Sequence, residues 1–180
     1  SRLVEEEPID FQLVREEIKR RDSTCKTVLL VKRIPKGFVG KIGYVFYLLK
    51  RMYHIATSKV CIIDSYIIPI SVLKHKESLK VIQIPHGLGI IKNVGYEAVG
   101  TKEGTDELTA KEMNMHQNYD YVIANGPEAG RLYVEAYRVD PSTIKLTGMP
   151  RLDYLKDTKE SIDPKTKEMC PTLDEKETIV

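Results

Sequence analysis

The sequence has only three cysteines in 180 residues, Cys25, Cys61 and Cys170, and they are widely spaced. An odd, scattered set argues against the disulfide framework that holds small secreted domains together. No CxxC pair and no Cys/His pattern with metal-ligand spacing occurs, so neither a metal nor another cofactor is predicted. Reduced thiols in a cytoplasmic protein are therefore expected.

Long hydrophobic runs are also missing. The longest apolar stretch covers residues 42–49 and includes Gly43, whereas a membrane-spanning helix needs about 20 apolar residues. No segment has the pattern of a signal peptide. Any membrane association is therefore expected to be peripheral.

Acidic residues are absent from Ser23 to Ile63, although the net charge of the whole chain is only +2. That stretch carries eight bases: Lys26, Lys32, Arg33, Lys36, Lys41, Lys50, Arg51 and Lys59. Aromatic residues lie between them, which suits an interfacial helix on anionic lipid. A solvated helix face with extended lysines fits the composition as well. Nucleic acid is not predicted as a partner, because no recognised binding motif accompanies the charge.

Short apolar runs alternate with helical periodicity along the chain. Strands are predicted at Thr27–Val31, Val60–Ile63, Val81–Ile84, Tyr121–Ala124 and Ile144–Thr147. Helices are predicted at Asp10–Arg21 with Asp10 as N-cap, Phe38–Ala56, Thr105–Asn118 and Pro127–Tyr137. The alternation predicts an α/β domain with a mainly parallel sheet and helices on both faces.

Polar residues follow these strands directly. In a parallel sheet the carboxyl ends of the strands share one edge, where open α/β sheets bind ligands. The sequence therefore places Asp64, Ser65, Asn125 and Arg151 at one edge as candidate substrate-binding residues.

His86 also follows a strand, and it precedes Gly87 and Gly89. Bare backbone amides at such a turn bind a phosphate, and Lys92 adds a positive charge. A neutral imidazole, with an ordinary pKa near 6.5, accepts a proton from a hydroxyl at neutral pH. Phosphoryl transfer to an alcohol is one interpretation. The other is that His86 ends a strand and the glycines only serve the turn.

Five segments together resemble the amino-terminal half of CDP-glycerol glycerophosphotransferases, the enzymes of teichoic-acid synthesis. They are DFQLVREEIKRR, MYHIATSKVCIIDSY, SVLKHKESLKVIQIPHGLGIIKNVGYE, MHQNYDYVIANG and VDPSTIKLTGMPRLDYL. The resemblance covers most of residues 1–155. It departs from the family at Pro85, where many members have an aromatic residue, and at Lys92, which lies six rather than five residues after the histidine.

The resemblance implies a Rossmann-like acceptor-side domain over residues 1–155, similar to the amino-terminal domain of a GT-B transferase. Residues 156–180 are then a charged tail or linker towards a second domain that binds CDP-glycerol, and one more strand is expected ahead of Ser1. By the same resemblance His86 matches the proposed general base. Gly87 and Lys92 share its motif, while Gly148, Pro150, Arg151 and Asp153 match a later structural or cleft-lining motif.

The leading hypothesis is therefore the acceptor and catalytic-base domain of a peripheral enzyme at the cytoplasmic face of the membrane. It would move glycerol phosphate from CDP-glycerol to a lipid-linked polyol-phosphate acceptor and release CMP, and this domain alone should be inactive without the donor site. Two alternatives remain: a non-catalytic module that binds a membrane or polyphosphate, and half of a GT-B sugar transferase with another nucleotide donor.

Overall fold

The computed structural model describes residues 6–33, 35, 37–87, 92–102 and 104–157. Helices and strands alternate along the chain in the manner expected for an α/β domain. In order they are α1 (Ile9–Arg21), α2 (Phe38–Thr57), β1 (Val60–Ile63), α3 (Ile68–Val72), β2 (Lys80–Gln83), the 3₁₀ helix η1 (Gly95–Ala98), α4 (Glu107–Glu112), β3 (Tyr121–Ala124), α5 (Pro127–Tyr137), the 3₁₀ helix η2 (Pro141–Thr143), β4 (Ile144–Leu146) and α6 (Pro150–Asp157).

The four strands form one parallel sheet in the order β1-β2-β3-β4, so each strand pairs with the next along the chain. This confirms the predicted parallel sheet. Ile63, Val81 and Val122 from three neighbouring strands are each at most 2% exposed, and they lie at the centre of the hydrophobic core. The strands are short, apolar and β-branched because both faces of the sheet are covered.

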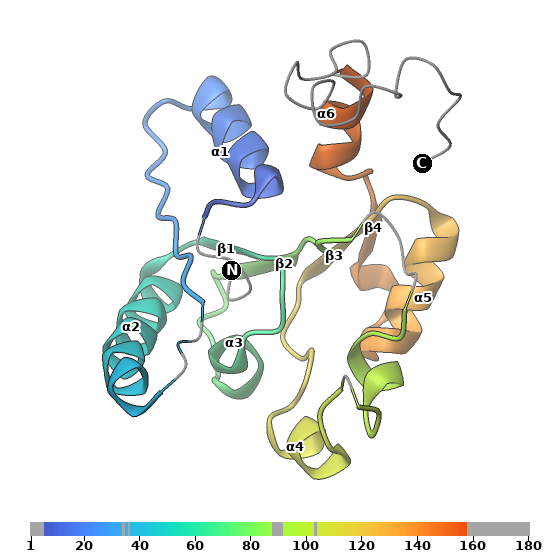
Figure 1. Ribbon diagram of the computed structural model, residues 1–180. Helices are drawn as coiled ribbons and strands as arrows, with labels where there is room; N and C mark the ends of the chain where they lie inside the picture. Colours follow the sequence, from blue (N-terminus) through green and yellow to red (C-terminus); the bar gives the residue numbers. More distant parts are fainter. Residues whose placement is uncertain (1–5, 34, 36, 88–91, 103, 158–180) are drawn as a thin grey trace, which may run out of the picture.

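Helices lie on both sides of the sheet, as predicted. Figure 1 shows α1 and α6 on one side and α2, α3 and α5 on the other. Helix α5 packs tightly on β3 and β4 because Gly130 has no side chain: a Cβ there would lie 3.0 Å from Cγ2 of Ile144. The buried side chains of Tyr133, Ala136 and Tyr137 complete that contact with the core.

The predicted strand Thr27–Val31 is wrong: these residues form neither a strand nor a helix. The β-branched run has the composition of a strand, but a strand also needs a neighbour with which to exchange hydrogen bonds. The sheet ends at β1, and a groove separates β1 from residues 25–30.

The predicted helix Thr105–Asn118 is also too long, because α4 ends at Glu112. Beyond it Asn114, His116 and Asn118 have φ values of 44°, 63° and 65°, which no right-handed helix contains. The side chain of Asn118 donates to the carbonyl oxygens of Ile70 at 3.0 Å and Ser71 at 3.1 Å. Contacts with α3 therefore override the helical periodicity of this stretch.

Asp10 is not the N-cap of the first helix. Pro8 occupies that position without a side-chain cap, and Asp10 lies buried in the first turn. Its carboxylate instead pairs with Arg151 at the start of α6, a helix that the sequence analysis did not predict. Residues 158–180, which include most of the predicted tail, lie outside the described residues, so the division near residue 155 stays a prediction.

Candidate active site at the carboxyl edge of the sheet

Three neighbouring strands deliver predicted site residues to one edge of the sheet. Asp64 and Ser65 follow β1, His86 follows β2 after two residues, and Asn125 follows β3. The strands are parallel and adjacent, so all of these residues lie at the carboxyl edge. The structure therefore brings together residues that are 61 positions apart in the sequence, from 64 to 125.

The imidazole of His86 is exposed, and its Nδ1 lies 3.2 Å from the main-chain oxygen of Asp64. A carbonyl oxygen can only accept a hydrogen bond, so Nδ1 must carry the proton. In the neutral ring the lone pair then belongs to Nε2, which is the nitrogen able to accept a proton. The contact between the ends of β1 and β2 thus fixes both the orientation and the tautomer of the ring.

Asp64 and Ser65 are buried, with 6% and 8% of their surface exposed. The Ser65 hydroxyl donates to Oδ1 of Asp64 at 3.0 Å. This bond stabilises the turn whose carbonyl holds His86. Their burial favours a supporting role beneath the imidazole over direct contact with a substrate.

The remaining predicted residues near this edge differ in exposure. Gly87 and Asn125 are half-buried, whereas Lys92 is exposed. Gly89 lies outside the described residues, as do Leu88, Ile90 and Ile91. The segment is described again from Lys92 onward, where a bend leads to η1.

Arg151 is half-buried, and its guanidinium is engaged by Asp10. Nε donates to Oδ2 of Asp10 at 2.9 Å, a second guanidinium nitrogen contacts the same oxygen, and the Arg151 amide donates to Oδ1 at 3.2 Å. These contacts to one buried carboxylate join α1 to α6. The geometry therefore favours the structural role of Arg151 over a phosphate-binding one.

His116 belongs to an aromatic cluster in the core. It is buried, its ring stacks on Tyr137 with centroids 4.2 Å apart, and its Nδ1 lies 3.0 Å from the hydroxyl of Tyr119. Packing is thus the observed role of this histidine. Sequence reasoning missed the cluster because its members are spread from Tyr66 to Tyr137 without a regular period.

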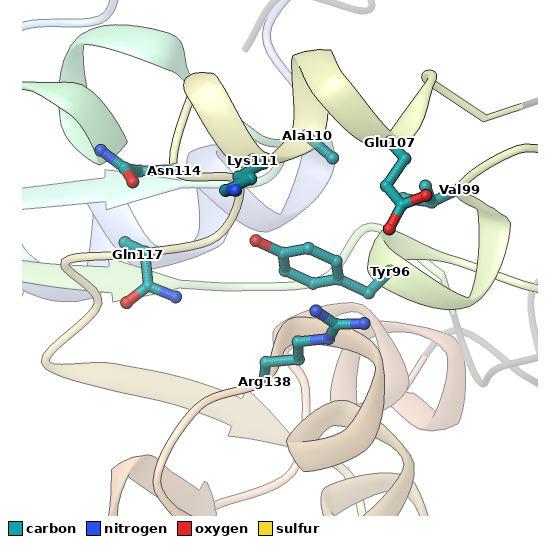
Figure 2. A pocket seen from close by; sticks show the side chains of 8 residues that line it. All are labelled: Tyr96, Val99, Glu107, Ala110, Lys111, Asn114, Gln117 and Arg138. Atoms are coloured by element: carbon teal, nitrogen blue, oxygen red, sulfur yellow. The ribbon is translucent and has the colours of Figure 1, made fainter.

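A polar pocket of about 520 Å³ lies between η1, α4 and the end of α5. Figure 2 shows Lys111 and Glu107 reaching towards it from α4, with the Arg138 guanidinium stacked on the Tyr96 ring; the guanidinium carbon lies 4.0 Å from the ring centroid. Helix α5 starts at the carboxyl edge and returns, so Arg138 marks the amino edge of the sheet. The described lining residues include none of the predicted site residues, and no motif in the sequence pointed to them.

Across the described part of the chain, no helix has both the length and the apolar character required to cross a membrane.

Comparison with known proteins identifies a family. The model of the CDP-glycerol:poly(glycerophosphate) glycerophosphotransferase family matches residues 8–180. The chain is 32% identical to the teichoic acid ribitol-phosphate primase of Bacillus spizizenii over 145 residues, which are 81% of this chain and 37% of the primase. It is 26% identical to the teichoic acid glycerol-phosphate primase of Bacillus subtilis over 117 residues, covering 64% of this chain and 31% of that protein.

A solved structure of the wall teichoic acid polymerase TagF has a similar fold, with a TM-score of 0.55 at 15% identity, over 82% of this chain and 36% of that one. The chain thus spans about a third of the length of these relatives. Because the family model covers nearly all of the sequence, the chain belongs to the CDP-glycerol:poly(glycerophosphate) glycerophosphotransferase family.

Proposed function

We propose that this chain is the amino-terminal, acceptor-side domain of an enzyme that transfers glycerol phosphate from CDP-glycerol to a hydroxyl of a lipid-linked teichoic-acid acceptor. His86 is the general base. The donor site lies in a second domain that faces this one across a cleft, as in GT-B transferases. Membership of the family supports the reaction class. The position of His86 after β2, at the carboxyl edge of the sheet, supports its role.

The observation that carries this proposal is the hydrogen bond between Nδ1 of His86 and the main-chain oxygen of Asp64. A general base needs an accessible lone pair held in one direction. The bond gives the exposed ring a fixed tautomer with Nε2 open to solvent. His116 is buried. His75 is also held by a main-chain oxygen, with its Nε2 2.6 Å from that of Ile70, but it precedes β2 and so does not follow the carboxyl end of a strand.

The transfer step follows from that geometry. Nε2 of His86 takes the proton of the acceptor hydroxyl as its oxygen attacks the β-phosphorus of CDP-glycerol. A new P–O bond forms to the acceptor, the phosphoanhydride bond breaks, and CMP leaves with the electron pair. In this proposal Lys92 and the backbone amide of Gly87 stabilise the charge on the transferred phosphate.

Helix α2 is the surface that would meet the membrane. Its exposed apolar side chains recur at positions i, i+1, i+4, i+7 and i+8, which share one face of a helix. They are Val45, Phe46, Leu49, Met52 and Tyr53, with exposures between 38% and 69%. Lys50 lies among them and is exposed as well. An apolar face with an exposed lysine beside it suits the interface of an anionic membrane.

CMP release by the full-length enzyme tests the role of His86. His86→Ala should lower kcat by at least 100-fold while leaving the KM for CDP-glycerol nearly unchanged, because the donor binds elsewhere. His54→Ala on α2 is the matched control, since it removes an imidazole away from the carboxyl edge, and it should retain wild-type turnover. Near-normal turnover of His86→Ala would eliminate the proposed base. If the same variant also kept its vesicle binding, a non-catalytic membrane module would be favoured instead.

A further inference from the structure

The polar pocket of about 520 Å³ at the amino edge of the sheet has no part in the transfer step proposed for His86. Its lining combines two cations, a carboxylate, two side-chain amides and a phenol hydroxyl. They are Lys111, Arg138, Glu107, Asn114, Gln117 and Tyr96 (Figure 2). Because the cations outnumber the carboxylate and the other groups are polar, the pocket suits a small ligand that is both anionic and rich in hydroxyl groups.

Two glycines allow the walls of this pocket to approach one another. Gly95 has a φ of 57°, and a Cβ there would overlap the main-chain oxygen of Ala136, so η1 lies directly against α5. A Cβ at Gly104 would overlap the main-chain oxygen of Ala98, so the loop that leads into α4 lies directly against η1. Backbone contacts therefore fix η1 between α4 and α5, and the pocket is a built part of the fold.

Arg138 directly follows α5 at one side of the pocket. Its φ of 52° and ψ of 43° are left-handed, a conformation that favours glycine at the end of a helix. The guanidinium carbon lies 4.0 Å from the centroid of the Tyr96 ring. A guanidinium that stacks on a ring face keeps its N–H donors in its own plane, pointing away from the ring. The contact with Tyr96 thus orients these donors and leaves them able to bind an anion.

Neither cation of the pocket is paired with a carboxylate of the described residues. Five other arginines do have such partners: Arg15, Arg20, Arg21, Arg131 and Arg151. Lys111 and Arg138 therefore face the same pocket with their charges available. A phosphate suits this pair, because a guanidinium and an ammonium both donate charge-assisted hydrogen bonds to its oxygens.

The uncharged groups and the carboxylate add a preference for hydroxyls. The side-chain amides of Asn114 and Gln117 both donate and accept hydrogen bonds, whereas ionised Glu107 only accepts them. In Figure 2 the hydroxyl of Tyr96 points towards the space between Lys111 and Gln117. A polyol phosphate offers hydroxyl donors to the carboxylate and phosphate oxygens to the cations. Inorganic phosphate satisfies only the cations.

We propose that this pocket is a second ligand site and binds one polyol-phosphate unit, with the phosphate between Lys111 and Arg138 and the hydroxyls against Glu107 and the two amides. The unit has two possible sources: free sn-glycerol 3-phosphate, or a link within the acceptor chain, which rests on the proposed function. The sheet edges are separated by four-residue strands such as β2, roughly 13 Å long. One unit therefore cannot occupy both edges, whereas a longer chain can.

Equilibrium dialysis of the full-length protein with labelled sn-glycerol 3-phosphate tests the site, with saturating CDP-glycerol and no acceptor so that the donor site is filled. Arg138→Gly removes the guanidinium and suits the left-handed backbone, so its melting temperature should stay within about 3 °C of wild type. This variant and Lys111→Gln should each weaken binding at least tenfold. Lys145→Gln is the matched control, because Lys145 lies over the ring of Tyr121 outside the pocket, and it should bind within twofold of wild type.

Three results would overturn the proposal: no binding of sn-glycerol 3-phosphate by the wild type, unchanged affinity in both pocket variants, or equally tight binding of inorganic phosphate. An oligomer of glycerol phosphate then identifies the source. Binding at least tenfold tighter than that of the single unit, and lost in Arg138→Gly, assigns the site to the acceptor chain. Equal binding of oligomer and single unit assigns it to the free metabolite. Dialysis requires no turnover, so these outcomes are separate from the activity of His86→Ala, which tests the proposed function.

Discussion

Asp120 joins the beginnings of two neighbouring strands through its side chain and its backbone. Its carboxylate accepts from Nζ of Lys80 at 2.8 Å and from the Val81 amide at 2.9 Å, and its own amide donates to the Val81 carbonyl at 2.9 Å. Partial burial acts to raise the pKa of this carboxyl, but the hydrogen bonds from Lys80 and Val81 outweigh it. The pKa of Asp120 therefore lies below its ordinary value of 3.8.

This lowered pKa predicts a pH-dependent contribution to stability. The ionised form is favoured in the folded state, so the contribution is complete above the unfolded-state pKa near 3.8 and is lost as the pH falls through the folded-state value. Asp120→Asn should lower the free energy of unfolding by about 1 kcal/mol at pH 7, a modest figure because Lys80 is half-exposed. Urea titrations should show the difference from wild type shrinking below pH 4.

Glu112→Gln is the matched control for that titration, because it neutralises an exposed carboxylate on α4. The free energy of unfolding of Glu112→Gln should stay close to that of wild type at each pH. If the free energy of unfolding of Asp120→Asn stayed below that of wild type at the lowest pH, the lost stability would come from the changed shape of the side chain and not from its charge.

At the scale of elements, α2 has apolar side chains that can be changed without disturbing the core. Their effect on membrane binding can therefore be measured separately from their effect on stability. Phe46 and Leu49 are 69% and 55% exposed, so charging them should leave the fold intact. If this face enters the membrane interface, Phe46→Glu combined with Leu49→Glu should reduce partitioning onto phosphatidylglycerol vesicles at least tenfold, because each change adds a charge where apolar area would be buried. Vesicle sedimentation measures this directly.

Leu108→Glu supplies the control, because Leu108 is 68% exposed on another helix, α4. It should sediment with vesicles as the wild type does. Equal vesicle binding by the wild type, the α2 double variant and Leu108→Glu would show that α2 does not contribute to membrane binding. If high salt abolished vesicle binding completely, the attraction to the vesicles would come from the charge of the lysines alone.

The elements also differ in how well the sequence predicted them. Val60–Ile63 and Tyr121–Ala124 were correct to the residue, because a β-branched run with a paired neighbour needs nothing further. Thr27–Val31 has the same composition, but no strand of the described residues pairs with it, and a strand needs a neighbour with which to exchange hydrogen bonds. The helix predicted for Thr105–Asn118 ends early, at Glu112. Asn114, His116 and Asn118 have positive φ values, and the Asn118 side chain is bonded to α3.

The candidate site was predictable to a similar degree. His86, Asp64 and Asn125 met at one edge because the rule for parallel sheets fixes that edge without any knowledge of side-chain contacts. The bond that orients His86 and the burial of Asp64 and Ser65 depend on the exact path of two turns, which composition does not encode. The substrate-binding role of Arg151 stays a prediction, and its observed partner Asp10 is 141 residues away in sequence and looked locally like an N-cap.

At the scale of the whole molecule, the pair between Asp10 and Arg151 links the first helix to the last one. The side chain of Asp10 is 4% exposed and that of Arg151 is 24% exposed, so removing one partner leaves a largely desolvated charge. Asp10→Asn should therefore lower the free energy of unfolding by about 3 kcal/mol, measured by urea denaturation followed by circular dichroism. Glu17→Gln breaks an exposed pair on the same helix and should change the midpoint very little.

A double-mutant cycle decides whether the pair itself is responsible. Adding Arg151→Met to Asp10→Asn should recover much of the loss, because the unpaired guanidinium is then gone. Additive losses from the two substitutions would show that the residues act separately and that α1 is held to α6 by other contacts.

The distance along the chain between these two residues also has a consequence during synthesis. A ribosome adds residues at the carboxyl end, and its exit tunnel hides the newest part of the chain, so Asp10 emerges long before Arg151 is available. Until then its carboxylate has no guanidinium to bind and should remain in water, with α1 undocked from α6. Among the described helices, α1 is made before the others but can dock only after α6 has emerged. A nascent chain with Arg151 still inside the tunnel should therefore expose α1 to proteolysis.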